Sequence, residues 1–121
     1  MKLPGHDHPI TVTRNLNRVR VSFGGKVIAD TTRALILQEA SYPPVQYIPR
    51  ADANMTLLKK TAHATHCPYK GDASYYSIET GKSTAQNAVW SYEQPFAAVK
   101  EIAGHLAFYP NRVDKIEEMP L

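Results

Sequence analysis

Residues 18–30 read Arg-Val-Arg-Val-Ser-Phe-Gly-Gly-Lys-Val-Ile-Ala-Asp, and this stretch decides the fold class. Apolar and polar residues alternate over 18–23, which places the apolar ones on one face of a β-strand. Gly24 and Gly25 follow, and glycine readily adopts the positive φ of a tight hairpin turn. Residues 26–30 then continue as a second strand. The stretch therefore predicts an antiparallel β-hairpin.

Short extended segments continue on both sides of this hairpin. The segment 34–40 could also be helical, but it is short and Pro43-Pro44 follow it, which favours a strand. One helix is expected near 95–103, with Pro95 at its first position, Ala98, Ile102 and Ala103 on one face, and Gly104 as its stop. The other strand candidates are 10–13, 45–48, 55–64, 73–79, 87–92, 106–109 and 113–117.

Many short strands with one late helix predict a mainly β protein rather than a doubly wound α/β fold. We expect a single compact antiparallel β domain over 1–121, with 1–9 as a lead-in segment. A chain of 121 residues is long enough for a modest core without disulfides or a structural metal.

Charge and cysteine content narrow the functional classes. The net charge is +3, and no run of basic residues is longer than Lys59-Lys60. Nucleic-acid binders usually concentrate their basic residues, so no nucleic-acid partner is expected. The only cysteine, Cys67, cannot form an internal disulfide and suits a reducing compartment. No apolar stretch resembles a signal peptide or a membrane span, so we expect a cytoplasmic protein without a membrane partner.

The segment 63–76 holds the densest set of reactive and polar side chains. Pro68 and Gly71 suit a tight corner whose backbone N–H groups could bind an anion, and Lys70 would add a positive charge. The alternative is an ordinary turn with a solvated lysine. Cys67 could act as a nucleophile activated by His66 or Lys70, although free cysteines commonly fill core space. The histidine spacing presents too few ligands for one ion, so neither a metal nor a cofactor is expected.

Two further clusters carry polar and aromatic residues. Arg50 offers a planar fork for a carboxylate or phosphate, or it could pair with a nearby acidic residue such as Asp52. Trp90 could be either core or a platform for a ligand. A pocket lined by aromatic rings and a few charged groups is typical of small-molecule sites. The tyrosines in or beside the three clusters are Tyr47, Tyr69, Tyr75, Tyr76 and Tyr92.

These motifs closely resemble a small bacterial family known as domain of unknown function 427, over almost the whole chain. The resemblance is carried by Tyr47-Ile48-Pro49-Arg50-x-Asp52, by Cys67-Pro68-Tyr69-Lys70-Gly71-x-Ala73-x-Tyr75-Tyr76, by Ala88-x-Trp90-x-Tyr92-x-x-Pro95 and by Ala107-Phe108-Tyr109. The opening Leu3-Pro4-Gly5-x-Asp7-His8-Pro9-Ile10 is also similar to members of that family.

The resemblance implies a fold of the Mss4-like, tent-shaped β type. This chain lacks the paired Cys-x-x-Cys motifs that hold zinc in true Mss4 proteins. The family has also carried a nucleotidyltransferase-like label, but the chain has no Gly-Ser pair followed by spaced aspartates. The site residues that the resemblance implies are Arg50, Asp52, Cys67, Tyr69, Lys70, Tyr75 and Trp90.

The leading hypothesis is a pocket for a small anionic molecule, a nucleotide or phosphorylated metabolite, that is used for binding or for catalysis. Arg50 and Lys70 would hold the anion, and Trp90 with the tyrosines would contact the rest of the ligand. One alternative is a cysteine-dependent enzyme that uses Cys67, with His66 or His63 as its base. The other alternative is a structural or interaction module that forms a homodimer. The residues alone do not decide whether a reaction is catalysed.

Overall fold

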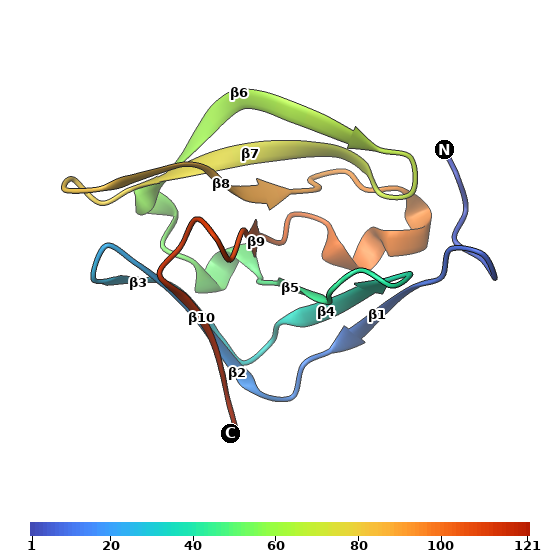
Figure 1. Cartoon of the computed structure of the whole chain (residues 1–121), viewed down its shortest axis with the longest axis horizontal. Helices are drawn as coiled ribbons and strands as arrows, with labels where there is room; N and C mark the ends of the chain where they lie inside the picture. Colours follow the sequence, from blue (N-terminus) through green and yellow to red (C-terminus); the bar gives the residue numbers. More distant parts are fainter.

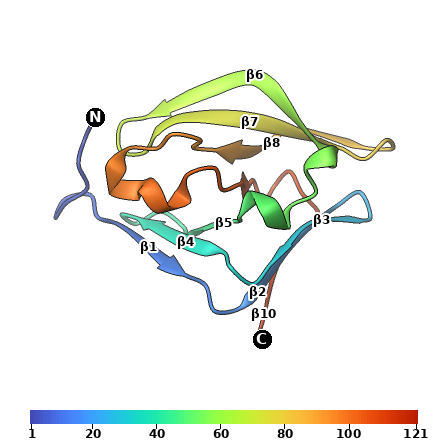
Figure 2. The same ribbon diagram turned by 180° about the vertical axis from the view of Figure 1, so that it is seen from behind.

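The protein is built from three antiparallel β-sheets, which a computed structural model describes over all residues 1–121 (Figures 1 and 2). A four-stranded sheet forms the upper layer in Figure 1, and two three-stranded sheets lie below it. The mainly β, antiparallel architecture expected from the sequence is therefore confirmed. None of the helices has the length and apolar character needed to cross a membrane.

The four-stranded sheet has the order β6-β7-β8-β9. Its long strands β6 and β7 form a hairpin, and an isolated bridge between Ile48 and Leu106 links the β9 side of the sheet to the strands below. The bounds are β6 (Leu58–Cys67), β7 (Gly71–Glu79), β8 (Thr84–Ser91) and β9 (Ala107–Phe108).

The two lower sheets have the orders β1-β4-β5 and β10-β2-β3. Their bounds are β1 (Ile10–Arg14), β4 (Leu35–Glu39) and β5 (Val45–Tyr47) in the first, and β10 (Lys115–Met119), β2 (Arg18–Phe23) and β3 (Lys26–Thr31) in the second. Two single-turn 3-10 helices, η1 (Arg50–Asp52) and η2 (Met55–Leu57), lead from β5 to β6.

The hairpin predicted at residues 18–30 is confirmed as β2 and β3. Gly24 and Gly25 have φ values of +61° and +76°, which side-chain-bearing residues rarely adopt. The alternation also holds, because Val19 and Val21 are fully buried. The segment 34–40 contains the strand β4 (Leu35–Glu39), as its length and the following prolines indicated.

The late helix differs from the prediction in type and in buried face. It is a 3-10 helix, η3 (Ala97–Ile102), with a kink at Val99, where φ is −126°, and Pro95 lies outside it. Ile102 is buried as predicted, but its buried companion is Val99, and Ala98 and Ala103 are exposed. In a 3-10 helix residues three apart share a face, so a prediction based on the α-helical period pairs Ile102 with the wrong neighbours. Gly104, with φ +70°, follows the helix as expected.

The buried side chains form two clusters on opposite faces of the four-stranded sheet. Tyr76, Ile78 and Val89 belong to a larger cluster, which includes Val19 and Val21 of β2. Tyr75 and Ala107 belong to a smaller cluster that faces β4 and β5 and contains η3. Because successive residues of a strand point to opposite faces, Tyr75 and Tyr76 enter different clusters. This separation decides which of the predicted site residues can meet.

Candidate functional site

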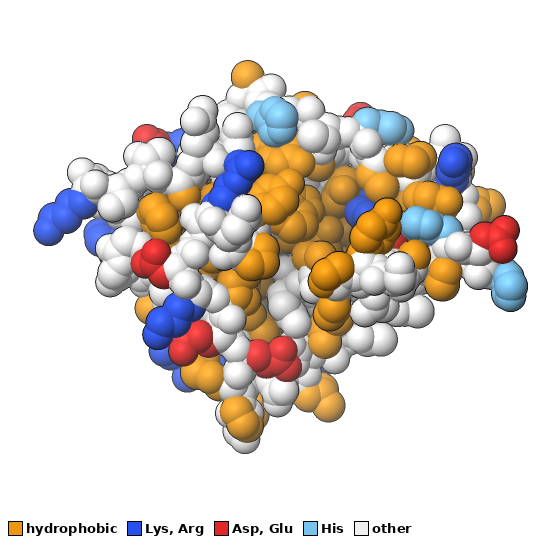
Figure 3. All heavy atoms as spheres, viewed as in Figure 1, with side chains coloured by type: hydrophobic (Ala, Val, Ile, Leu, Met, Phe, Trp, Pro, Cys, Tyr) orange, Lys and Arg blue, Asp and Glu red, His pale blue; other side chains and the backbone are white.

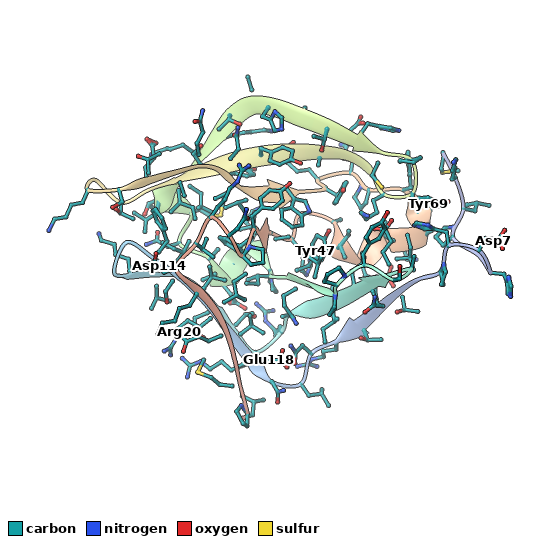
Figure 4. The ribbon with its side chains drawn as sticks, viewed as in Figure 1. Asp7, Arg20, Tyr47, Tyr69, Asp114 and Glu118 are labelled. Atoms are coloured by element: carbon teal, nitrogen blue, oxygen red, sulfur yellow. The ribbon has the colours of Figure 1, made fainter.

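The candidate site is a cavity of about 200 Å³ between the four-stranded sheet and the β4–β5 pair. We call it the tyrosine cavity, because aromatic residues form most of its wall. They are Tyr42, Tyr47, Tyr75, Trp90, Tyr92 and Tyr109. Figure 3 shows hydrophobic side chains around a hollow at the centre of one face, and Figure 4 places Tyr47 at the middle of the molecule.

Strand register brings the aromatic residues together. Tyr75 of β7 lies directly opposite Trp90 of β8, so both side chains project from the same face of the sheet. Tyr47, at the end of β5, rises from the opposite layer and its hydroxyl accepts the Trp90 indole N–H at 3.2 Å. Tyr109 stacks obliquely on Trp90, with ring centroids 4.5 Å apart. Four separate segments thus form one aromatic wall.

An ion pair between Lys70 and Glu39 also borders the tyrosine cavity. Their side chains are 10% and 15% exposed, and the Lys70 ammonium donates to Glu39 Oε1. The second carboxylate oxygen of Glu39 lies 2.7 Å from His8 Nε2. Burial alone would raise the pKa of Glu39, but hydrogen bonds from Lys70 and His8 outweigh it and hold the pKa below 4.5. Both Glu39 oxygens therefore already have partners.

Two buried tyrosine hydroxyls in this cavity still have hydrogen-bonding capacity. Every fully buried side-chain nitrogen and oxygen in the protein has a partner. The Tyr92 hydroxyl has no hydrogen-bond partner although the residue is only 6% exposed, so its oxygen is not fully enclosed by protein. Tyr92 is also one of the residues that line the cavity. Tyr47 accepts from Trp90, but its own O–H donates to no group. Burial raises the pKa of both phenols far above the ordinary value, so they remain protonated donors.

Tyr75 and Tyr109 extend the polar edge of the same cavity. The Tyr75 hydroxyl lies 3.0 Å from Thr65 Oγ1 and 3.4 Å from the Tyr109 hydroxyl. Burial, together with the Tyr75 contact, raises the pKa of Tyr109 to about 12. The His63 ring packs edge-on against Tyr75, with centroids 4.4 Å apart. These groups already have partners, which distinguishes them from Tyr47 and Tyr92.

Arg50 belongs to a different hydrogen-bond network, on the face of the four-stranded sheet that carries the larger cluster. Its guanidinium donates to the Gly104 carbonyl at 3.1 Å, to the Tyr76 hydroxyl at 3.0 Å and to Ser91 Oγ at 3.3 Å. Tyr76 in turn donates to Glu93 at 3.0 Å. Arg50 does not line the tyrosine cavity, so the structure does not bring it to the same pocket as Lys70.

Three other predicted site residues also lie outside this cavity. Asp52 accepts from Thr31 Oγ1 at 2.7 Å and from Arg33 at 3.2 Å. Tyr69 forms part of the β6–β7 turn, where its ring stacks on His8 at 3.9 Å. Cys67 is half-buried against the smaller cluster. Of the residues predicted for the site, Lys70, Tyr75 and Trp90 line one cavity.

No histidine is positioned as a base for Cys67. His66 Nδ1 lies 2.7 Å from Asp72, and His63 packs on Tyr75. The Cys67 thiol forms no hydrogen bond with either ring. No group of three or more histidine, cysteine, aspartate or glutamate side chains lies close enough together to hold a metal ion. Catalysis by Cys67 stays a prediction from the sequence.

Comparison with known proteins identifies the family. A protein-family model described as a domain of unknown function (DUF427) matches residues 11–119. The chain belongs to this family. No curated protein matches the chain in sequence. This description names no activity.

Sequence reasoning missed Glu39, the partner of Lys70. Glu39 lies 31 residues before Lys70 and belongs to no motif that the sequence singles out. The sequence prediction also placed His8 in a lead-in segment, whereas His8 contacts both Glu39 and Tyr69. The available signal was indirect. A buried lysine needs a carboxylate partner, and Glu39 lies within the predicted strand segment 34–40.

Proposed function

We propose that the protein binds a small carboxylate in the tyrosine cavity. The observation that carries this proposal is the excess of hydrogen-bond donors there. The hydroxyls of Tyr47 and Tyr92 donate to no protein group, and the Lys70 ammonium has hydrogens beyond the one it donates to Glu39. These unused donors favour a ligand that supplies acceptor oxygens.

Charge and size favour a carboxylate over the phosphates expected from the sequence. Lys70 and Glu39 neutralise each other, and the phenols are neutral, so the cavity offers hydrogen bonds rather than a strong positive field. Such a site suits a single negative charge better than a doubly charged phosphate. A cavity of about 200 Å³ is also smaller than the roughly 300–1,000 Å³ typical of ligand sites, which supports a ligand smaller than a nucleotide.

A thermal-shift screen of small carboxylates, phosphate esters and nucleotides tests this proposal. A ligand present at about a hundred times its Kd adds about 2.7 kcal/mol to stability, which raises the Tm by several degrees. We expect carboxylates to give this shift, and phosphates and nucleotides to give none. Shifts confined to phosphates or nucleotides would contradict the choice of carboxylate, and a blank screen would contradict the proposed site.

A matched pair of hydroxyl deletions locates the ligand. Tyr92→Phe removes one cavity donor and should weaken carboxylate binding about tenfold or more, since a hydrogen bond to a charged group contributes roughly 1.5–3 kcal/mol. Tyr69→Phe removes a hydroxyl outside the cavity and should leave the Kd unchanged. Equal Kd values for Tyr92→Phe and the unmodified protein, measured by calorimetry, would place the ligand elsewhere.

A further inference from the structure

A second cavity adjoins the tyrosine cavity and has a different chemical character. It has a volume of about 340 Å³ and lies between β5, β9 and β10. We call it the apolar cavity. Its wall includes Val21 and Ile48, which are at most 1% exposed, together with Phe108 and Ile116. Gln46, Asp114 and Lys115 are its polar members.

The two cavities share part of their walls. Val45 and Trp90 line both of them. The Trp90 ring lies between Tyr109, which stacks on it, and Tyr47, which binds its N–H. The hydrophobic hollow in the centre of Figure 3 is bordered by side chains of both layers. The two cavities are therefore neighbours, with Val45 and Trp90 at their common boundary.

We infer that the ligand is a carboxylate with an unbranched apolar chain, whose head occupies the tyrosine cavity and whose chain occupies the apolar cavity. This inference rests on the proposed carboxylate site. The unused donors of Tyr47, Tyr92 and Lys70 select the charged head. The apolar walls beyond Trp90 bury the chain, and each buried methylene strengthens binding about fourfold. Neither cavity alone has both properties.

A chain-length series tests the inference in the unmodified protein. Trp90 is the only tryptophan and lines both cavities, so its fluorescence reports occupancy directly. We expect the Kd to fall about fourfold per methylene from butyrate to octanoate. The matched alcohol, octanol, should bind at least tenfold more weakly than octanoate because it lacks the charged head.

A comparison of two variants tests whether the apolar chain of the ligand lies in the apolar cavity. Ile116 is half-buried on β10 and lines the apolar cavity, so Ile116→Phe should narrow that cavity. This variant should bind octanoate about tenfold more weakly and should leave the Kd of butyrate unchanged. Ile36→Phe is the matched control, because Ile36 is half-buried on β4 and lines neither cavity. Thermal melting confirms that both variants fold. The wild-type series remains decisive if Ile116→Phe does not fold.

The possible results separate the inference from the proposed function. Butyrate binding with no gain for longer chains would overturn the inference and leave the carboxylate site standing. Octanol binding as tightly as octanoate would remove the carboxylate site and with it the inference. If Ile36→Phe weakened octanoate binding as much as Ile116→Phe, the placement of the ligand's apolar chain in the apolar cavity would be overturned.

Discussion

The charge of Lys70 is tolerated at 10% exposure because Glu39 lies beside it, and His8 contacts the other oxygen of Glu39. An ion pair this buried contributes little net stability over an apolar pair, but removing one partner strands the other charge. Because Lys70 and Glu39 carry opposite charges, the net charge around the tyrosine cavity is close to zero. The residue expected to hold an anion thus donates to Glu39, and this carboxylate partner sets its position.

Acid should weaken the fold through Glu39. The folded-state pKa of Glu39 lies below its ordinary value of 4.5, so the stabilisation is fully present above pH 4.5 and is lost as the pH falls through the folded pKa. We expect the free energy of unfolding, measured by urea denaturation, to decline from pH 5 to pH 3. Glu39→Gln should be less stable by about 3 kcal/mol at pH 7 and show a flatter pH dependence.

The exposed pair of Arg18 and Asp30 provides the control for this experiment. The Arg18 hydrogen bond also lowers the pKa of Asp30, but that pair lies at the surface, where ion pairs contribute little. Asp30→Asn should therefore retain most of the stability of the unmodified protein at pH 7. A loss as large as that of Glu39→Gln would show that burial is not the cause of the Glu39 effect.

At the scale of elements, the β6–β7 hairpin fixes the position of Lys70. Its turn, residues 68–70, is closed by the pairing of Cys67 with Gly71, and the Lys70 carbonyl accepts the N–H of Phe96 at 2.9 Å. Gly71 has a φ of +112°, and an added Cβ would meet backbone atoms of 94–96 at 3.6 Å. Space is thus adequate, and the backbone conformation is what requires glycine.

Gly71→Ala should therefore destabilise the protein by about 1–3 kcal/mol, the usual cost of holding a side-chain-bearing residue in such a conformation. Gly5→Ala is the matched control, because Gly5 has ordinary φ and nothing lies within 4 Å of its added Cβ. Urea denaturation of both variants measures the difference. Similar stability for the two variants would mean that the turn relaxes to accept a side chain.

Element type was predictable where a local pattern decides it. Alternation around Gly24 and Gly25 identified β2 and β3, since both strand period and turn chemistry are local properties. The tighter winding of η3 was not predictable, because Val99 lies at its kink and packs in the smaller cluster, whose other members come from distant segments. The register that sets Tyr75 opposite Trp90 was also not predictable, because it depends on the pairing of two strands.

At the scale of the whole molecule, the site depends on contacts between distant segments. Lys70 and Glu39 are 31 residues apart, Tyr47 and Trp90 are 43 apart, and Arg50 and Ser91 are 41 apart. Motifs in the sequence identified many of the participants but could not assign them to one cavity. Arg50 joined Gly104 and Ser91 instead, because those partners lie on the other side of the sheet.

The N-terminal segment connects two of these distant parts. His8 stacks on Tyr69 of the β6–β7 turn and binds Glu39 of β4, and the backbone N–H of Lys2 donates to the Pro68 carbonyl at 2.7 Å. In Figure 4 the labelled Tyr69 lies beside this segment, and Asp7 lies farther out. The segment thus holds the hairpin turn and β4 together at the end of the cavity where Lys70 meets Glu39.

His8→Ala should lower the free energy of unfolding by about 1–2 kcal/mol, because it removes a ring stack and a hydrogen bond to a carboxylate. It should also speed amide hydrogen exchange in the β6–β7 turn, because the turn loses its anchor. His6→Ala is the control, since His6 is fully exposed and contacts only Asp7. If both variants behave alike, the segment rests on the surface without supporting the site, and Lys70 is positioned by Glu39 and the hairpin alone.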